Sequence, residues 1–491
     1  MVERVLVTGA TGYVGGRLVP RLLEAGYQVR VLVRDPTHLQ GRPWVERVEV
    51  FQGDVLQPER LVEALRDVKA AYYLIHSMRA GEDFRERDVH AARNFAQAVR
   101  GAVLERIIYL GGLGDPNKKL SEHLRSRHEV GKILTESGIP VLEFRSAVIV
   151  GSGSASFEMM RYVVEGLPII FCPPWVTTKI QPISIRDVLD YLIAALKLSD
   201  KQLKAHQIVE IGGSEVLTYH DMMYGYAHAR GLRRLMIVLP YLPIRLCANW
   251  LQWITPIPAG VAYVLIESIR NEVIMRDDTA RRLFPEIQPR NYQVSLERAL
   301  RRISADQVET TWSDAQVTYT GDIHPVTLTT YEGLLLERRQ RLTSASPNAI
   351  YRTFTGLGGK RGWLHANWIW IARGIIDRLV RGPGFRRGRR HPVELRVGDA
   401  VDFWRVEAIE PDHLLRLRAE MKVPGLAWLQ FDVTPHSSGK NLVTQTAFFE
   451  PKGLPGLMYW YLLYPIHGWM FSMLIRRVVE RAEKTIEYPL R

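Results

Sequence analysis

The sequence predicts an α/β fold, a doubly wound parallel sheet, followed by a smaller α+β domain. Three observations lead to this prediction. Short apolar runs alternate with helical stretches over residues 1–145, a glycine-rich turn follows the first run, and the last third changes to short alternating segments closed by a long helix. Strands that alternate with helices imply parallel strands joined by helical crossovers, with helices on both faces of the sheet.

Six apolar runs in the first part are expected to be strands. They are residues 5–7, 29–33, 48–51, 72–75, 107–110 and 141–144. Helical stretches separate them, and the first of these repeats Leu18, Leu22 and Leu23 on one face. This alternation is that of βαβ units, so the strands are expected to run parallel.

Beyond residue 151 the alternation loosens, although 208–211 still has the pattern of a strand and 217–229 that of a helix. Residues 235–266 hold one basic residue, Arg245, no acid before Glu267, and four prolines. Because prolines break helices, this segment is expected to form a pair of short buried or interfacial helices rather than a single membrane span.

The last third is expected to be a separate domain. Residues 304–346 are weakly patterned and are interpreted as a connector, so the predicted domains are 1–303 and 347–491. Pro347 is typical of the first turn of a helix. Short alternating segments over 401–449 indicate an antiparallel sheet, and a long helix follows them.

The composition excludes several classes of protein. Two cysteines, Cys172 and Cys247, cannot build a disulfide framework or a cysteine zinc site, and both are interpreted as small buried hydrophobic residues. No metal site is expected. The N-terminus lacks a charged segment followed by an apolar signal core. The expected location is therefore the cytoplasm, with peripheral contact at the inner face of the membrane left open.

The net charge of +13 is concentrated in the last third, where residues 343–491 contain 22 Lys and Arg against 13 Asp and Glu. The densest basic run, 378–391, suits an anionic membrane surface or nucleic acid, or it is a solvated loop. No zinc-finger, helix-turn-helix or RNA-recognition pattern accompanies it, so no nucleic-acid partner is predicted.

The strongest functional signal is the turn after the first apolar run, where Gly9, Gly12 and Gly15 are spaced by three. Gly9 allows a tight turn, Gly12 lets the backbone approach a pyrophosphate, and Gly15 lets the following helix pack closely on the strand. The helix N-terminus adds N–H groups and the positive end of its dipole. The residues predicted to hold a dinucleotide here are Thr8, Gly9, Thr11, Gly12, Tyr13, Val14 and Gly15.

This spacing resembles the extended and atypical short-chain dehydrogenase/reductase superfamily, over about residues 1–300. Gly53, Asp54 and Val55 match the family segment that meets the adenine ring, and residues 181–188 match a segment typical of the extended members. Within the superfamily the chain is most similar to NmrA-like proteins and to the dinucleotide-binding accessory subunit of respiratory complex I. The resemblance implies a Rossmann-type fold and a nicotinamide cofactor.

Arg34 favours NADP as that cofactor. It follows the second apolar run, where an NAD-specific site usually places an acid on the ribose hydroxyls. An arginine there can pair with the 2′-phosphate of NADP. Asp35 comes directly after it and leaves NAD open. Ile75 and His76, after the fourth run, are expected beside the nicotinamide.

The active site departs from the family pattern. Family members use Tyr and Lys four residues apart on a helix, but no Lys in this chain has Tyr four residues before it. His128 and Lys132 occupy the matching place, and His128 is either a candidate acid or base or a surface helix residue. Residues 111–114, Gly-Gly-Leu-Gly, replace the family serine. His76 and Ser77 are a further candidate pair. With both family groups missing, we expect that His128 does not simply replace the tyrosine.

The order of elements over 347–491 resembles START-like or polyketide-cyclase-like helix-grip domains, in which a sheet wraps a long helix around an apolar cavity. Fusions of the two domain types resemble a bacterial type of unassigned function. Residues 454–475 carry no formal charge, are rich in aromatic side chains, and are expected to be interrupted by Pro465 and Gly468. They are interpreted as core or cavity wall, with a membrane interface or a span as the alternatives.

These observations together predict an NAD(P)H-dependent oxidoreductase that acts on a hydrophobic small molecule. Its second domain would hold or shield that ligand. The alternative is a non-catalytic dinucleotide-binding sensor or assembly factor near membranes. The missing tyrosine is the feature that separates these two hypotheses.

Overall fold

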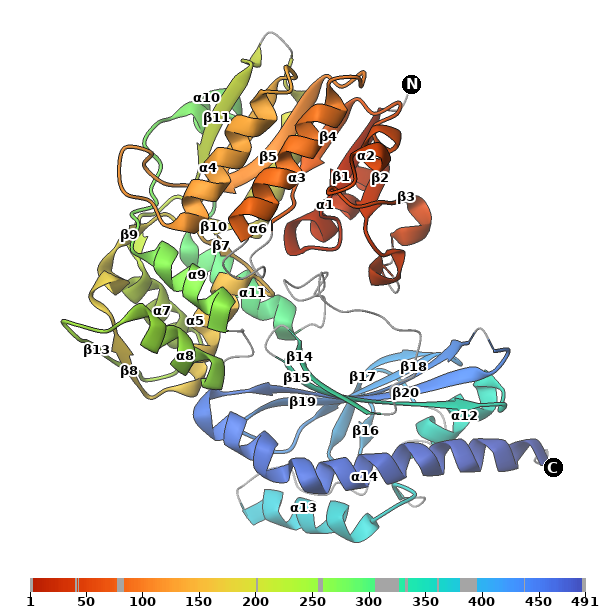
Figure 1. The fold of residues 1–491 in the computed structure, drawn as a ribbon. Coiled ribbons are helices and arrows are strands. Elements are labelled where there is room, and N and C mark those ends of the chain that lie inside the picture. Colours follow the sequence, from red (N-terminus) through yellow and green to blue (C-terminus); the bar gives the residue numbers. More distant parts are fainter. Residues whose placement is uncertain are drawn as a thin grey trace. The chain divides into compact units, whose positions relative to one another are not determined.

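A computed structural model describes most of the chain as two compact units, Met1–Thr320 and Gly321–Arg491 (Figure 1). The described residues are 3–39, 42, 44–76, 84–199, 202–254, 259–304, 326–331, 334–359, 362–379, 395–436 and 438–487. Ser77 and all but the first two residues of the basic run at 378–391 lie outside the described residues. Each unit has its own hydrophobic core.

The first unit is built on a seven-stranded sheet of order β11-β6-β5-β4-β1-β2-β3. All neighbouring pairs in it run parallel. Its strands are β1 (Arg4–Thr8), β2 (Gln28–Val33), β3 (Glu49–Gln52), β4 (Ala70–Tyr73), β5 (Arg106–Gly112), β6 (Val141–Ser146) and β11 (His206–Ile211). The Rossmann-type, doubly wound prediction is confirmed. The strand order reverses between β1 and β4, and such a reversal marks the crevice where these sheets bind ligands.

Helices cover both faces of this sheet because alternate residues of a strand face opposite sides. Val5 and Val7 belong to one buried core, and Leu6 between them belongs to the other. Helices α1 and α6 pack on the first core, and α2, α3 and α4 on the second. Their bounds are α1 (Tyr13–Glu24), α2 (Pro58–Ala64), α3 (Phe84–Val99), α4 (Glu122–Thr135) and α6 (Ile185–Ala194).

The rest of the first unit consists of short strands and helices. The strands are β7 (Ile149–Val150), β8 (Ile169–Cys172), β9 (Lys179–Ile180), β10 (Ile183–Ser184), β12 (Leu217–Thr218) and β13 (Leu235–Val238). The helices are α5 (Ala155–Gly166), α7 (Tyr219–Ala229), α8 (Ile244–Ile254), α9 (Ala259–Ile269), α10 (Thr279–Leu283) and α11 (Tyr292–Ser304). Short 3-10 turns cover Pro36–Leu39, Val45–Arg47, Pro174–Thr177 and Ala195–Lys197. The expected helix pair within 235–266 is present as α8 and α9, with β13 before it.

The second unit is a seven-stranded antiparallel sheet of order β14-β15-β20-β19-β18-β17-β16. Its strands are β14 (Val326–Tyr331), β15 (Leu334–Thr343), β16 (Ala400–Val401), β17 (Trp404–Glu410), β18 (Leu414–Ala419), β19 (Gly425–Pro435) and β20 (Asn441–Pro451). Its helices are α12 (Pro347–Thr355), α13 (Asn367–Leu379) and α14 (Gly453–Glu487). The antiparallel sheet expected over 401–449 is confirmed.

The segment expected to be a connector, 304–346, contains β14 and β15. β15 lies inside the sheet, between β14 and β20. Its strand pattern is obscured in the sequence because Glu337 and Arg339 alternate onto the buried face, where they form an ion pair. Charged residues on the inner face remove the apolar alternation by which a half-buried strand is recognised.

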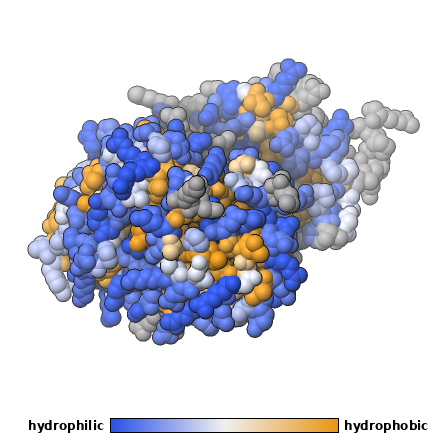
Figure 2. All heavy atoms as spheres, turned by 90° about the horizontal axis from the view of Figure 1, so that it is seen from above, coloured by the Kyte–Doolittle hydropathy of each residue, from blue (hydrophilic) through white to orange (hydrophobic). Residues whose placement is uncertain are grey.

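Helix α14 crosses one face of this sheet and runs without a break through Pro465 and Gly468, contrary to the expected interruption (Figure 1). The carbonyl oxygen of Gly468 accepts hydrogen bonds from Arg339 Nη2 at 3.0 Å and from Ser472 Oγ at 2.8 Å. No helix among the described residues is both long and apolar enough to cross a membrane. On the face shown in Figure 2, hydrophilic side chains surround scattered groups of apolar ones, which is ordinary for a protein surface.

Candidate functional site

The glycine turn joins β1 to α1 with almost no space beside its backbone. Gly9 has φ of +74°, and a Cβ there would lie 2.7 Å from the carbonyl oxygen of Leu74. A Cβ on Gly15 would lie 2.3 Å from the carbonyl oxygen of Gly9, so α1 packs directly on the turn. Gly12 donates its N–H to the same oxygen at 3.0 Å. A tight turn at Gly9 and close packing at Gly15 are thus what the backbone requires.

The N-terminus of α1 has the features of an anion-binding site. Its N-cap residue is Gly12, which offers no side-chain cap, and its first turn carries no acid. The first N–H groups of a helix have no partner within the helix, and the helix dipole is positive at that end. The turn and α1 therefore fit the pyrophosphate of a dinucleotide.

Thr8 and Tyr13 flank this turn, and each contacts another part of the chain. Thr8 Oγ1 donates to the carbonyl oxygen of Tyr72 at 2.9 Å and accepts from the N–H of Leu74 at 3.2 Å. It thereby ties β1 to β4 at the reversal of strand order. The ring of Tyr13 lies 4.3 Å from the guanidinium carbon of Arg17. Thr11 and Val14, also predicted to contact the dinucleotide, are half-buried in the same turn and the start of α1.

The residues predicted for the adenosine half follow β2 and β3. The Arg34 side chain is exposed, and within the described residues no acid pairs with it. Asp54 Oδ1 accepts from the N–H of Leu56 at 3.0 Å. Val55 is buried, and its carbonyl oxygen accepts from Asn94 Nδ2 at 3.1 Å. Because β1, β2 and β3 run parallel, all these positions share one edge of the sheet.

His76 stands at the same edge, three residues after β4. Its Nδ1 lies 3.1 Å from Asp88 Oδ2, and a carboxylate accepts, so Nδ1 carries the proton. Its Nε2 is buried and has no hydrogen-bond partner among the described residues. Burial lowers the pKa of His76, the charge of Arg127 lowers it further, and the bond to Asp88 opposes both. The neutral ring therefore presents a bare acceptor nitrogen.

A second histidine, His123, lies beside the first. The two ring centroids are 4.8 Å apart, and Nδ1 of His123 is also buried without a partner among the described residues. Burial, together with neighbouring His76 and Arg127, holds the pKa of His123 well below its usual value. His123, Arg127 and Asp88 were not among the residues predicted from the sequence, although the spacing of four between His123 and Arg127 places both on one face of a helix.

Arg127 anchors α4 to the sheet edge. Its Nη2 donates to the carbonyl oxygen of Leu110, its Nη1 lies 3.5 Å from the carbonyl oxygen of Ile75, and its guanidinium carbon lies 5.0 Å from the centre of the Tyr109 ring. Tyr109 Oη in turn donates to the backbone oxygen of Arg127 at 2.9 Å. No three His, Cys, Asp or Glu side chains of the described residues are grouped to hold a metal ion.

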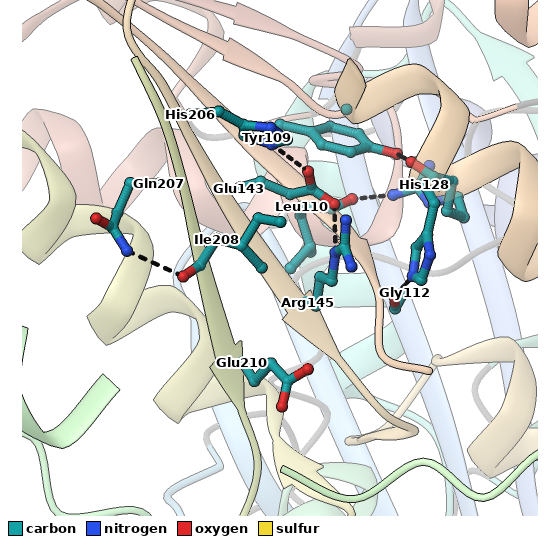
Figure 3. Close-up of polar contacts among 12 residues, drawn as sticks. Tyr109, Leu110, Gly112, His128, Glu143, Arg145, His206, Gln207, Ile208 and Glu210 are labelled. Carbon is teal, nitrogen blue, oxygen red and sulfur yellow. Dashed lines mark hydrogen bonds and ion pairs between the residues drawn. The ribbon is translucent and has the colours of Figure 1, made fainter. Parts of the chain in front are cut away.

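His128 and Lys132 do not lie in one environment. His128 is buried, and its Nε2 donates to the carbonyl oxygen of Gly112 at 3.0 Å (Figure 3). Burial and then the charge of Arg145 lower the pKa of His128 to about 4. Lys132 is exposed. At Gly112, one of the residues that replace the family serine, an added Cβ would lie 2.7 Å from Leu124 Cδ2, so the Leu124 side chain packs against the backbone there.

A buried ionic group lies beneath α4. Glu143 of β6 is fully buried and accepts from Arg145 Nε at 2.6 Å and from His206 Nε2 at 2.7 Å (Figure 3). Burial alone would raise the pKa of Glu143, but the bond from His206 and the charge of Arg145 outweigh it and lower the pKa. α4 passes directly over this carboxylate, because a Cβ on Gly131 would lie 2.2 Å from Oε2.

An apolar cavity of about 350 Å³ lies in the second half of the first unit. Its lining includes Val163 of α5, Trp175, Tyr219 of α7, and Ile266 and Ile269 of α9. Nε1 of Trp175 is buried and has no partner among the described residues. The volume is within the range of about 300–1,000 Å³ typical of small-molecule sites.

Helix α9, which lines the cavity, also contacts the start of α4, the helix that carries His123. Ser121 is the N-cap of α4, and its backbone N–H donates to Asn271 Oδ1 at 2.9 Å. Its Oγ lies 3.3 Å from the Oγ of Ser268. Ser268 belongs to α9, which lines the cavity, so α4 is bound at its start to a cavity wall.

Comparison with known proteins agrees with this geometry. A family model described as NAD(P)H-binding matches residues 9–140. The chain carries an NAD(P)H-binding domain. A second model, described as a protein of unknown function (DUF2867), matches residues 332–474.

Among curated proteins, the chain is 29% identical over 242 residues to a ceramide reductase of Caulobacter vibrioides, covering 48% of this chain and 73% of that relative. It is 39% identical over 114 residues to a putative dihydroflavonol 4-reductase of Synechocystis, covering 22% of this chain and 32% of that relative. The chain thus spans about a third of the second relative's length. A nucleoside-diphosphate-sugar epimerase structure from Staphylococcus aureus superposes with a TM-score of 0.50 at 17% identity, covering 60% of this chain and all of that one.

The family match supports the predicted nicotinamide cofactor, and the two curated relatives are reductases by name. They do not favour a dinucleotide-binding protein without turnover. The epimerase likeness shows the fold alone.

Proposed function

We propose that the first unit transfers hydride between NADP and a ketone or secondary alcohol on an apolar small molecule. The observation that carries this proposal is the apolar cavity of about 350 Å³, whose wall α9 is bound to the start of the helix that carries His123. The two relatives named above are reductases by name, which agrees with the proposal.

The cofactor site is proposed residue by residue. The turn would hold the pyrophosphate with Thr8, Gly9, Thr11, Gly12, Tyr13, Val14 and Gly15. Asp54 and Val55 would meet the adenine, and Ile75 and His76 the nicotinamide. Arg34, exposed and without an acidic partner in the described residues, would pair with the 2′-phosphate, so NADP is proposed in preference to NAD.

When bound, the cofactor supplies or accepts a hydride, and a protein group must move the matching proton. We assign that group to His76 rather than to His128 or Lys132. The Nε2–H of His128 is occupied by the Gly112 carbonyl, and Lys132 is exposed. His76 Nε2 is buried, unpartnered among the described residues, and fixed in direction by Asp88.

The proton transfer follows from this tautomer. In alcohol oxidation, Nε2 of His76 takes the hydroxyl proton while the carbon–hydrogen bond breaks and its electron pair leaves as hydride. In ketone reduction, protonated His76 returns a proton to the oxygen that receives charge. Asp88 is a positioning residue that keeps the ring proton on Nδ1 and stabilises the imidazolium.

The cavity proposal is tested by narrowing the cavity. Val163→Trp fills space in the lining without touching the histidines, and Val62→Trp, an exposed position on α2, is the matched control. Steady-state NADPH oxidation with ketones of increasing alkyl length is expected to show KM raised at least about tenfold for long ketones in Val163→Trp only. An unchanged KM, or activity restricted to water-soluble ketones, would disprove the cavity as substrate site.

We propose further that the second unit is a START-like helix-grip domain. Its support is the long α14 lying across an antiparallel sheet and the cavity lined by residues of 459–471. The similarity to the accessory subunit of complex I stays a prediction.

A further inference from the structure

Strands β8 and β13 of the first unit pair in parallel as a small sheet of two strands (Figure 1), and one side of this sheet is exposed and apolar. Successive side chains of a strand point to opposite sides of a sheet. Ile170 and Met236 are paired and buried, so their side of the sheet faces the interior. The other side, the β8–β13 face, carries four apolar side chains that are each 37% to 55% exposed: Ile169, Phe171, Leu235 and Ile237.

The β8–β13 face continues to the opening of the apolar cavity of the first unit. Phe171 lines that cavity although it is 50% exposed, and so does Leu246 of α8, which is 58% exposed. These two side chains therefore lie at the cavity's opening. Leu239 and Leu242, in the loop between β13 and α8, also line the cavity, and Tyr241 between them in the chain is 82% exposed. The exposed face and the cavity thus form one continuous apolar surface.

The segments that carry this surface are basic. Residues 167–182 and 222–254 contain five Lys and Arg and no Asp or Glu. Two of the five cations, Arg230 and Arg234, bind to Glu165 and to the backbone of α5. The other three are exposed and pair with no acid among the described residues: Lys179, Arg233 and Arg245. The apolar surface is therefore accompanied by positive charge alone.

Charge and polarity together indicate an anionic lipid bilayer as the partner of the β8–β13 face. Apolar side chains bind at the boundary between headgroups and acyl chains, and exposed Lys and Arg side chains are attracted to anionic headgroups. Arg233 lies two residues before Leu235 in the chain, and Arg245 directly before Leu246, so the two kinds of group are adjacent. A second copy of the chain fits less well. A symmetric dimer brings the same surface together twice, so these cations would meet like charges and no acid of the same segments.

We propose that the β8–β13 face docks on an anionic membrane and that the apolar substrate enters the cavity of the first unit from the bilayer. The opening at Phe171 and Leu246 then lies against the acyl chains, and the substrate reaches the cavity without crossing water. The entry of substrate rests on the proposed oxidoreductase function, whereas the docking itself does not.

Docking is tested by flotation of the full chain with vesicles of phosphatidylcholine, with and without phosphatidylglycerol. Leu235→Glu puts a charge on the β8–β13 face at a residue that does not line the cavity. It is expected to lower the partition coefficient onto anionic vesicles at least about tenfold, the size of losing one buried leucine side chain. Val103→Glu changes an apolar residue that is 77% exposed and lies outside this face, so it is the matched control and is expected to bind like wild type.

The cations are tested separately, and they keep the test valid if Leu235→Glu does not fold. Arg233→Gln and Arg245→Gln are each expected to lower the partition coefficient onto anionic vesicles about fivefold and to leave neutral vesicles unaffected. Arg87→Gln, at an exposed arginine of α3, is the matched control. Because the whole chain has a net charge of +13, the difference between each variant and its control identifies the binding surface.

Substrate entry is tested with NADPH oxidation by a water-soluble short ketone and by a long-chain ketone carried in anionic vesicles. Leu235→Glu is expected to raise KM for the long ketone at least about tenfold and to leave the short ketone unchanged. The docking proposal is overturned if wild type does not float, if Leu235→Glu and both arginine variants float like wild type, or if Leu235→Glu dissociates a dimer of the chain instead. Flotation that depends on this face, with no ketone reduced by wild type, would support docking and refute the proposed function. Reduction of the short ketone without flotation would refute docking alone.

Discussion

His76 and Asp88, twelve residues apart in the chain, are joined through Nδ1 and Oδ2 at 3.1 Å, and this contact leaves the opposite ring nitrogen of His76 buried and unpartnered among the described residues. A carboxylate on one nitrogen fixes both the tautomer and the orientation of an imidazole. His76 itself follows β4, at the edge of the sheet where the strand order reverses. Proton transfer in the proposed reaction depends on this one contact.

Substitution of His76 is the most direct test. His76→Gln is expected to lower kcat for ketone reduction at least about a hundredfold, the size of losing a general acid, with little change in KM for NADPH. His128→Gln keeps a donor for the Gly112 carbonyl and is expected to stay close to wild type. Single-turnover NADPH oxidation measures both. Fast reduction in His76→Gln, with loss in His128→Gln, would move the role to His128.

The lowered pKa of His76 predicts how the rates of ketone reduction and alcohol oxidation change with pH. Burial and Arg127 lower this pKa below 6.5, with Asp88 opposing and His123 as the other titratable neighbour. Reduction needs the protonated ring, so its rate is expected to rise as pH falls, about tenfold per unit above the pKa. Oxidation needs the neutral ring and is expected to be flat above pH 6.5.

In Asp88→Asn the contribution that raises the pKa of His76 is removed. The pH profile of the ketone-reduction rate is therefore expected to shift to lower pH, and the maximum rate is expected to fall. A stopped-flow pH series on wild type and Asp88→Asn would measure this. Superimposable profiles would contradict a role for Asp88 in positioning His76.

Arg34→Ala is expected to weaken NADPH binding about tenfold or more and to leave NADH binding unchanged, because only NADPH carries the 2′-phosphate. The matched control is Arg87→Ala, because Arg87 is also exposed but lies on α3. Fluorescence titration with both cofactors measures the affinities. Equal loss for NADPH and NADH would place Arg34 elsewhere in the site.

Gly15→Ala tests the packing of α1 on the turn. The new Cβ would lie 2.3 Å from the Gly9 carbonyl oxygen, so the variant is expected to lose about 1–3 kcal/mol of stability and its cofactor binding. Gly101→Ala has nothing within 4 Å of the new Cβ and is expected to stay within about 0.5 kcal/mol of wild type. Urea unfolding monitored by circular dichroism compares the two.

The turn at Gly9 to Gly15 and the strands around it could be predicted because their signals are local. Glycine spacing, apolar runs and helix periodicity are all properties of neighbouring residues. The pairing of His76 with His123 could not be predicted in this way. It depends on how α4 packs across the end of β4, which no local pattern reveals.

Two other features of the structure could not be predicted from the sequence for similar physical reasons. Spacing of four puts His128 and Lys132 on adjoining turns, but at the border between the buried and exposed faces one becomes buried and the other exposed. β15 could not be recognised as a strand in the sequence, because Glu337 and Arg339 lie on its buried face, where they form an ion pair. The periodicity of apolar residues identifies the buried face of a helix or strand only when charged residues lie on the exposed face.

The contacts of Ser121 with Asn271 and Ser268 have a further consequence. They link the wall of the apolar cavity to the helix that carries His123, so a ligand that shifts α9 changes the surroundings of the histidine pair. Thermodynamic linkage then requires that the free energy by which substrate alters cofactor affinity equals that by which cofactor alters substrate affinity. The contacts of Ser121, together with the hydrogen bond from Asn271 Nδ2 to the Lys119 carbonyl oxygen, would carry this coupling.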